Sequence, residues 1–175
     1  DWAWDFYNAD GSNAEMCGNG ARCFARYIKR TTGGGNMPDF QTDCGIIHAN
    51  INGESVTVNL TAPQDLVINQ QIPTSIGEIP VHFLNTGVPH AVLVVDNADQ
   101  AMVEELGSEI RYHDHFAPAG TNVNFVQLGE DNIAVRTYER GVEDETLSCG
   151  TGAIAVAVVL NYSNIVNKEE IKISM

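Results

Sequence analysis

A five-residue pattern that could carry chemistry occurs twice in the chain. Cys-Gly-x-Gly-Ala begins at Cys17 and again at Cys149, 149 − 17 = 132 residues later, and each copy leads into a helix-like run. The N-terminus of a helix offers unpaired N–H groups and a partial positive charge, so it can hold a carboxylate and lower the pKa of a nearby thiol. Glycines beside the cysteine let a ligand approach these N–H groups closely. The pattern predicts two reactive thiols and four carboxylate-binding backbone donors, at Gly18, Asn19, Gly150 and Thr151.

Two such thiols are suited to moving a proton at a carbon atom. If both helix starts point at one bound molecule, a thiolate removes a proton from one side and a thiol returns one to the opposite face, which inverts the stereocentre. The α proton of an amino acid is only weakly acidic, and preorganised backbone donors stabilise the charge that builds on its carboxylate. We therefore predict a small-molecule amino acid substrate, no pyridoxal or other cofactor and no metal. The two thiols are expected to share one proton as a coupled pair.

A structural role is the alternative reading for each cysteine. A single cysteine near a helix start is more often a packed core residue than a catalyst. Two copies favour catalysis, because packing alone gives no reason to keep both glycines beside both cysteines. Cys23 lies six residues after Cys17, about 240° around the same helix, so these two could not bind one metal. We assign Cys23 and Cys44 to the core.

Three further side chains suit the same chemistry. His90 follows a proline between two expected strands, and it is either a turn residue bonded to the backbone or a group that tunes a nearby thiol. Glu139 and Arg140 lie at an expected strand end. They are either a solvated ion pair or partners for the ammonium and carboxylate groups of a substrate.

The elements that must position these residues follow from the hydrophobic pattern. In the first half, a helix after Cys17 is expected to end at Gly33, and Asn52-Gly53 predicts a hairpin. In the second half, we expect a helix over 150–162, apolar on every side and therefore buried all round, and a short helix over about 99–106. Strands are expected over 81–84, 91–95, 123–128 and 133–138, the last two joined by a turn at 129–132.

The stretch 61–79 contains two prolines and many polar residues, and it is the expected boundary between the halves. We place the division near residue 62, giving an N-terminal half, 1–62, and a C-terminal half, 63–175. Each half combines strands with one helix opened by the repeated pattern. The expected fold is therefore α+β, with two pseudosymmetric halves, each a mostly antiparallel sheet wrapped around a central helix.

Composition excludes several classes of function. The 175 residues include 9 Lys and Arg against 23 Asp and Glu, a formal charge of −14 that opposes a nucleic acid partner. The apolar run 153–160 is far shorter than the roughly 20 residues of a membrane span, so no membrane partner is expected. Four cysteines without paired spacing indicate reduced thiols. We expect a cytoplasmic location, and the sequence leaves a homodimer open.

Two segments of the chain resemble the diaminopimelate epimerase family. Residues 8–23, NADGSNAEMCGNGARC, closely resemble its long and specific signature, and residues 138–141, YERG, followed by 146–152, TLSCGTG, resemble its second-half counterpart. The resemblance implies a cofactor-independent isomerase that interconverts L,L- and meso-diaminopimelate, on the route to lysine and peptidoglycan.

The resemblance also implies roles for individual residues. Cys17 and Cys149 match the two catalytic cysteines, while His90 and Glu139 match groups that tune the acidity of the thiols. Positions that contact substrate in the family match Asn8, Gly18, Asn19, Asn122, Glu139, Arg140, Gly150 and Thr151. Val88 stands where the family often has a substrate-binding Asn. Family members usually carry longer N-terminal and closing segments, so we expect a fragment whose N-terminal half is incomplete.

Two other functions fit the pattern. Another two-cysteine racemase of the same fold would act on proline, hydroxyproline or histidine, although the signature and the Glu139-Arg140 pair favour diaminopimelate. A non-catalytic redox protein would use Cys17 and Cys149 as a reversible disulfide.

Overall fold

The chain divides into two compact units, Asp1–Ala62 and Pro63–Met175, and each is described by itself. The computed structural model describes residues 2–8, 11–130, 132–168 and 170–175. Ala9 and Asp10, which belong to the family signature, and Asp131, in the expected turn, lie outside the described residues.

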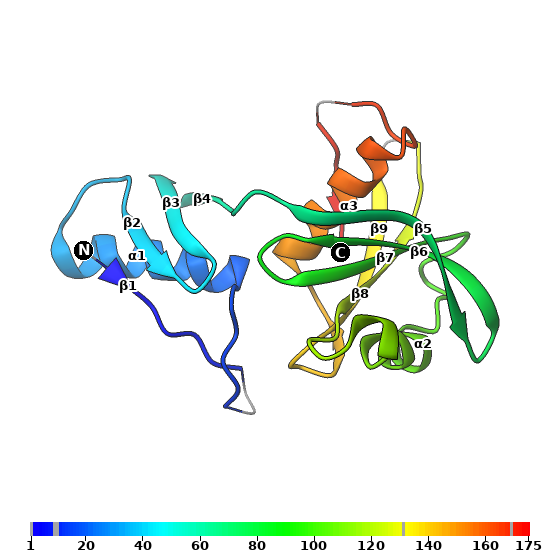
Figure 1. Cartoon of the computed structure of the whole chain (residues 1–175). Coiled ribbons are helices and arrows are strands. Elements are labelled where there is room, and N and C mark those ends of the chain that lie inside the picture. Colours follow the sequence, from blue (N-terminus) through cyan, green and yellow to red (C-terminus); the bar gives the residue numbers. More distant parts are fainter. Residues whose placement is uncertain (1, 9–10, 131, 169) are drawn as a thin grey trace. The chain divides into compact units, whose positions relative to one another are not determined.

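The described part of the first unit forms a four-stranded sheet in the order β1-β2-β3-β4 (Figure 1). β1 (Trp2–Ala3) pairs parallel with β2 (Asp39–Thr42), and β3 (Gly45–Asn52) pairs antiparallel with both β2 and β4 (Ser55–Asn59). Gly53 has a φ of 57°, the left-handed conformation that a tight hairpin turn needs. The hairpin predicted around Asn52-Gly53 is therefore confirmed.

Helix α1 (Gly18–Thr32) packs on β3 and β4 of this sheet. Its buried residues include Ala21, Ala25 and Ile28, spaced by four and three positions so that they fall on one face. Gly33 ends the helix in the left-handed conformation, with φ 63°, and its N–H donates to the carbonyl of Lys29. The small alanines let the helix lie close to the sheet.

The second unit contains a mostly antiparallel sheet in the order β10-β9-β8-β7-β6-β5, with β11 beside β9. The pairs β7–β8 and β9–β11 are parallel. The strands in chain order are β5 (Gln64–Thr74), β6 (Gly77–Asn85), β7 (Pro89–Val95), β8 (Asn122–Gln127), β9 (Ile133–Glu139), β10 (Asp144–Thr146) and β11 (Ile173–Ser174).

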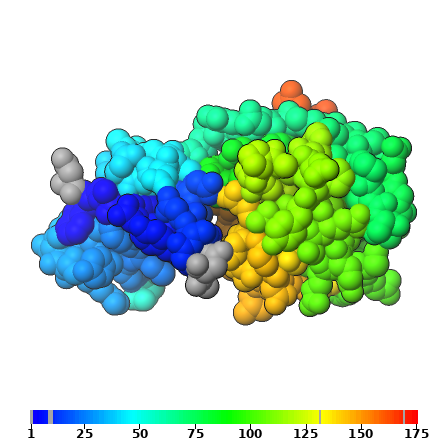
Figure 2. Space-filling view, turned by 60° about the horizontal axis from the view of Figure 1, so that its bottom comes forward, coloured from blue at the N-terminus to red at the C-terminus, as the bar shows by residue number. Residues whose placement is uncertain are grey.

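Two helices cover opposite faces of this sheet (Figure 1). Leu93 of β7 packs with α2 (Val103–Arg111), whereas its neighbour Val92 packs with α3 (Gly150–Tyr162), because successive strand residues point to opposite faces. In Figure 2 the yellow-green segment containing α2 and the short 3-10 helix η1 (Asp114–Phe116) covers one face of the unit. The predicted α+β class is confirmed, and α3 has the bounds expected from sequence.

Two segments of the second unit differ from what the sequence indicated. The division between the units follows Ala62, at the start of the stretch 61–79, but β5 and the start of β6 occupy most of that stretch. Positive φ values at Asp65 and Asn69 accompany register shifts that hide the strand alternation, and Pro73 is tolerated because β5 is an edge strand. The short helix begins at Val103, after a turn in which the N–H of Asp99 donates to Asn97 Oδ1.

Helix α3 is not buried all round. Ile154 is 37% exposed, because a single sheet packs against only one side of a helix. No helix in the described part of the chain combines the length and the apolar character that a membrane crossing requires.

Candidate active site

Cys17 is the N-cap residue of α1. Its backbone is extended, with φ −139° and ψ 111°, and its Sγ accepts a hydrogen bond from the N–H of Gly20 at 3.3 Å. The N–H groups of Gly18 and Asn19 belong to the first turn, which has no intrahelical acceptors to offer them. The half-buried sulfur thus lies where a helix terminus directs donors at negative charge.

The loop before Cys17 holds Asn8 by local contacts. Its backbone N–H donates to the carbonyl of Ser12 at 2.8 Å, and its Nδ2 donates to Ser12 Oγ at 3.0 Å. The exposed Asn19 instead accepts a hydrogen bond from Arg22. The structure thus places Asn8, Cys17, Gly18 and Asn19 in the first unit, on one loop and the helix that follows it.

The glycine after Asn19 is required by aromatic packing. A Cβ on Gly20 would lie 3.0 Å from the ring of Phe6 and 3.2 Å from that of Trp4, and these two rings stack with centroids 5.1 Å apart. The glycine therefore allows the aromatic segment 4–6 to cover the start of α1.

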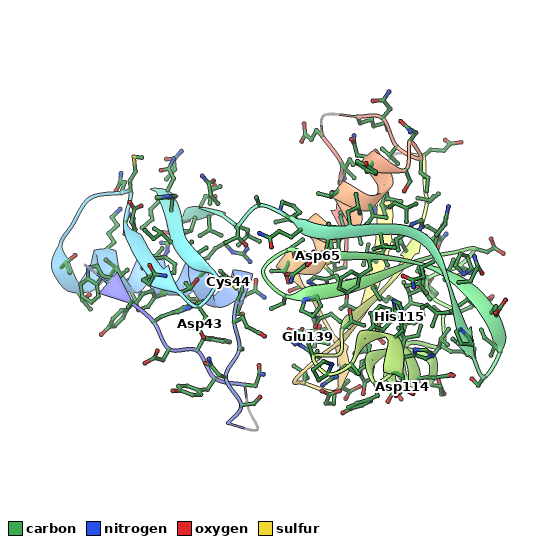
Figure 3. The ribbon with its side chains drawn as sticks, viewed as in Figure 1. Asp43, Cys44, Asp65, Asp114, His115 and Glu139 are labelled. Carbon is green, nitrogen blue, oxygen red and sulfur yellow. The ribbon has the colours of Figure 1, made fainter. Side chains whose placement is uncertain are left out.

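The remaining cysteines of the first unit differ from each other. Cys23 is exposed, so its assignment to the core was wrong: α1 turns Ala21, Ala25 and Ile28 toward the sheet instead. Cys44 lies half-buried beside Asp43 in the turn between β2 and β3 (Figure 3), and its Sγ donates to the carbonyl of Glu15 at 3.3 Å. Burial, and then the charges of Glu15 and Asp43, raise the pKa of the Cys44 thiol.

Cys149 occupies the same place on α3 as Cys17 does on α1. It is the N-cap residue, with φ −129° and ψ 105°, and it is only 6% exposed. Its Sγ lies 3.4 Å from the hydroxyl oxygen of Thr151. The two cysteines therefore share a backbone conformation, while their sulfurs have different partners: a backbone N–H for Cys17 and a side-chain hydroxyl for Cys149.

A row of buried polar side chains continues from Thr151 into the sheet. Thr151 Oγ1 lies 2.9 Å from Nε2 of His90, whose Nδ1 lies 3.2 Å from Nδ2 of Asn124. Asn124 Oδ1 in turn accepts from the hydroxyl of Thr137 at 3.0 Å. His90, Asn124 and Thr137 come from the adjacent strands β7, β8 and β9, and all three are fully buried.

His90 is held in its neutral form. Burial, and secondarily the positive charge of Arg140, lower the pKa of the imidazole from 6.5 to about 3. The ring therefore carries one proton at neutral pH, and it can donate from one nitrogen while it accepts at the other.

Asn122 joins two backbone segments beside this row. Its Nδ2 donates to the carbonyl of Pro89 and its Oδ1 accepts from the N–H of Arg140, both at 2.9 Å. The guanidinium of Arg140 donates to the carbonyl of Ala119 at 3.2 Å. Asn122 thus fixes the start of β8 against the segments that carry His90 and Arg140.

Glu139 lies at the end of β9 (Figure 3), and its Oε2 accepts from the hydroxyl of Thr146 at 2.8 Å. Two ion pairs brace the hairpin that follows: Arg111 binds Glu143 at 2.9 Å and Arg136 binds Glu145. The hairpin leads directly to Cys149, so these two ion pairs help to position the segment that precedes α3.

Of the residues predicted for the second unit, the structure links Cys149, Thr151 and His90 in one row, and Asn122 with Arg140 in another. Gly150 is the first residue of α3, and Val88 is buried just before β7.

Two buried members of the row, Asn124 and Thr137, were missed by the sequence analysis. The signal for Asn124 was available, since the asparagines at 122 and 124 share one face of a strand and alternate with the apolar Val123 and Phe125. Among the residues that the structure describes, no cluster of three or more His, Cys, Asp or Glu could hold a metal ion.

A protein-family model matches most of this chain. The family model described as diaminopimelate epimerase matches residues 1–66 and 82–175. The chain belongs to the diaminopimelate epimerase family. The diaminopimelate epimerase of Aquifex aeolicus is 48% identical over 177 residues, covering 99% of this chain and 63% of the relative. That of a Hydrogenobaculum species is 47% identical and covers 95% and 63%. The chain thus spans under two thirds of the length of these family members.

Two solved structures share the fold of this chain at low sequence identity. A hydroxyproline epimerase from Agrobacterium vitis, with bound trans-4-hydroxy-L-proline, aligns over 96% of this chain and 58% of its own, with a TM-score of 0.74 and 20% identity. A probable proline racemase from Agrobacterium radiobacter aligns over the same shares, with a TM-score of 0.75 and 16% identity. At these identities the likeness concerns the fold alone.

Proposed function

We propose that this protein acts as a diaminopimelate epimerase, interconverting L,L- and meso-diaminopimelate by proton transfer at the α carbon between Cys17 and Cys149, without a cofactor. The observation that carries the proposal is the shared geometry of the two cysteines. Each is the N-cap of a helix, with φ and ψ values within 10° and 6° of the other's (139 − 129 and 111 − 105). Family membership and the names of the relatives support the choice of substrate.

The helix termini account for binding of the reacting end of the substrate. The N–H groups of Gly18 and Asn19, and of Gly150 and Thr151, are first-turn donors. Directed at the substrate carboxylate, they stabilise the charge that grows there as the α proton leaves. This stabilisation is needed because the α proton of an amino acid is weakly acidic.

The proton balance requires both thiols at one substrate. One cysteine enters the reaction as a thiolate and takes the α proton, while the other enters as a thiol and gives its proton to the opposite face. The cysteines therefore exchange protonation states in each turnover, and which of them begins as the base depends on the stereoisomer bound. Neither has a fixed role.

Other site residues then act around the reacting centre. His90 and Glu139 tune the acidity of the thiols, and Asn8, Asn122 and Arg140 contribute to substrate binding. Asn122 is occupied by two backbone groups, so its part is to hold Arg140 in place. Val88 supplies no side-chain hydrogen bond to a substrate.

Deuterium exchange tests the proposal. Incubated with L,L-diaminopimelate in deuterated water, the protein should incorporate deuterium at the α carbon and form the meso isomer, as followed by NMR. Cys17→Ser and Cys149→Ser should each slow epimerisation by about 10²–10⁴-fold, the usual effect of removing a general acid or base. Cys23→Ser changes an exposed cysteine on the same helix as Cys17 and is the matched control. This variant should epimerise diaminopimelate at the rate of the parent protein.

Two outcomes would replace the proposal by its rivals. Exchange into proline, hydroxyproline or histidine alone would identify another racemase of this fold. Epimerisation that survives both cysteine substitutions would refute the catalytic role of Cys17 and Cys149. No exchange into any of these amino acids, together with a reversible disulfide between the two cysteines, would favour the non-catalytic redox protein. A cytoplasmic location and the absence of nucleic acid and membrane partners stay predictions of the sequence, which leaves a homodimer open.

A further inference from the structure

Asn124 has no part in the chemistry proposed above. Its side chain is nevertheless fully buried, and it lies beside His90, which does have a part in that chemistry. It lies on β8, in register with Val92 of β7 on one side and with Thr137 of β9 on the other. Burial of an amide is costly unless its donors and acceptor are all bonded, and here they are. The direction of these hydrogen bonds determines which ring nitrogen of His90 carries the proton.

The orientation of the Asn124 amide follows from its backbone partner. Nδ2 lies 2.9 Å from the carbonyl oxygen of Ala91, which can only accept a hydrogen bond, so the nitrogen and not the oxygen must face it. The opposite end, Oδ1, accepts from the hydroxyl of Thr137. The second hydrogen of Nδ2 is then available to Nδ1 of His90, 3.2 Å away.

This donor selects the tautomer of the imidazole. Nδ1 must be the unprotonated, accepting nitrogen, so the single proton of the neutral ring lies on Nε2. Nε2–H then donates to Thr151 Oγ1 at 2.9 Å. Because that oxygen is already accepting, Thr151 can direct its own hydroxyl hydrogen to Sγ of Cys149, 3.4 Å away.

The opposite tautomer of His90 would reverse the direction in which hydrogen bonds are donated between His90, Thr151 and Cys149. With the proton on Nδ1, the bare Nε2 would take the hydroxyl hydrogen of Thr151, and the threonine would then have no hydrogen for the sulfur. A hydrogen bond donated to sulfur favours the thiolate, whereas one donated by sulfur favours the thiol. The direction of the row therefore bears on which form of Cys149 is stable.

We propose that Asn124 is a positioning residue that holds His90 in the Nε2–H tautomer, so that Thr151 donates its hydroxyl hydrogen to Cys149 and stabilises the thiolate. The proposal deepens the proposed function, because it concerns a cysteine to which that function gives a proton-transfer role. Its tests measure protonation and not turnover, so that its failure and the failure of the epimerase assignment are distinguishable.

The first test observes His90 directly in the unaltered protein. Long-range ¹H–¹⁵N correlation spectra of protein with ¹⁵N-labelled histidine distinguish the two tautomers, and the signal missing from His90→Gln identifies the residue. We expect protonated Nε2 and unprotonated Nδ1 at neutral pH. Protonated Nδ1 would overturn the proposal, whatever the behaviour of any variant.

The second test follows the Cys149 thiolate through its ultraviolet absorbance, taken as the difference from Cys149→Ser. Asn124→Leu keeps the shape of the side chain but cannot donate, and should move the midpoint of thiolate formation up by about one pH unit, the equivalent of one hydrogen bond. Thr121→Val is the matched control. It removes another fully buried hydroxyl of the same unit, one that donates to the backbone of Asn122, and should leave the midpoint in place.

A double-mutant cycle separates positioning from general loosening of the fold. Thr151→Val removes the hydroxyl through which Asn124 acts, so adding Asn124→Leu to it should produce no further shift. A further shift of the same size in the Thr151→Val background would show that Asn124 acts by another route and would overturn the proposal. So would an unchanged midpoint in Asn124→Leu alone.

Discussion

Gly152 lies directly against the side-chain oxygen of Asn124. A Cβ placed on this glycine would be 2.4 Å from Asn124 Oδ1 and 3.3 Å from Sγ of Cys149. The second glycine of Cys-Gly-x-Gly-Ala therefore serves a different contact in each copy: aromatic rings at Gly20, and a buried amide at Gly152.

Gly152→Ala should destabilise the second unit by about 1–3 kcal/mol, the usual effect of overpacking a filled interior. The added methyl group must displace Asn124, whose side chain is enclosed by Ala91, His90 and Thr137. Unfolding in denaturant, followed by circular dichroism, measures the loss. Gly35→Ala is the control, because nothing lies within 4 Å of its Cβ position. Equal stability of both variants would contradict the prediction.

Acid should destabilise the second unit through His90. The pKa of this imidazole falls from 6.5 to about 3 on folding, so between these values the unfolded chain binds a proton that the folded protein does not. Stability is therefore complete above about pH 6.5 and decreases as pH falls toward 3, with a slope approaching about 1.4 kcal/mol per pH unit. Burial also lowers the pKa of His82, which adds to the effect in the same direction.

Denaturant unfolding between about pH 5 and pH 7 measures this slope before most carboxylates titrate. Both tryptophans lie in the first unit, so NMR signals of the second unit are the suitable probe. His90→Gln should make the slope shallower. A slope that is the same in the variant and the parent protein would refute the assignment to His90.

Asn122 is expected to be primarily a structural link. It is 4% exposed, and Asn122→Ala leaves the carbonyl of Pro89 and the N–H of Arg140 without their partner, at a cost of about 1–3 kcal/mol. Thermal unfolding detects this loss. A variant with unchanged stability but a raised KM for diaminopimelate would instead show that Asn122 binds the substrate directly.

The cysteines of the first unit should differ in reactivity. Cys23 is exposed, whereas Cys44 is half-buried and has a raised pKa, so a smaller fraction of it is thiolate at neutral pH. Alkylation followed by mass spectrometry of the cysteine peptides should therefore label Cys23 faster than Cys44. Asp43→Asn removes one of the charges that raise the Cys44 pKa and should speed its labelling. Faster labelling of Cys44 than of Cys23 in the parent protein would be inconsistent with this account.

Local patterns were enough to predict the features that depend on neighbouring residues. The Asn52-Gly53 turn, the glycine end of α1 at Gly33 and the full span of α3 are all present, because caps and tight turns are set by a few adjacent residues. The two cysteines at helix starts were found in the same way, from a repeated pattern that needs no knowledge of the fold.

Only the tertiary structure decided what depends on residues far apart in the chain. Strand β5 was missed because it is defined by pairing with β6 across two register shifts, and Cys23 was misassigned because the sheet selects which face of α1 is buried. The row from Thr137 through Asn124 and His90 to Cys149 needs three adjacent strands and a helix terminus to meet. No spacing along the sequence encodes that meeting, since each member is an ordinary polar residue until packing removes it from water and bonds it to the next.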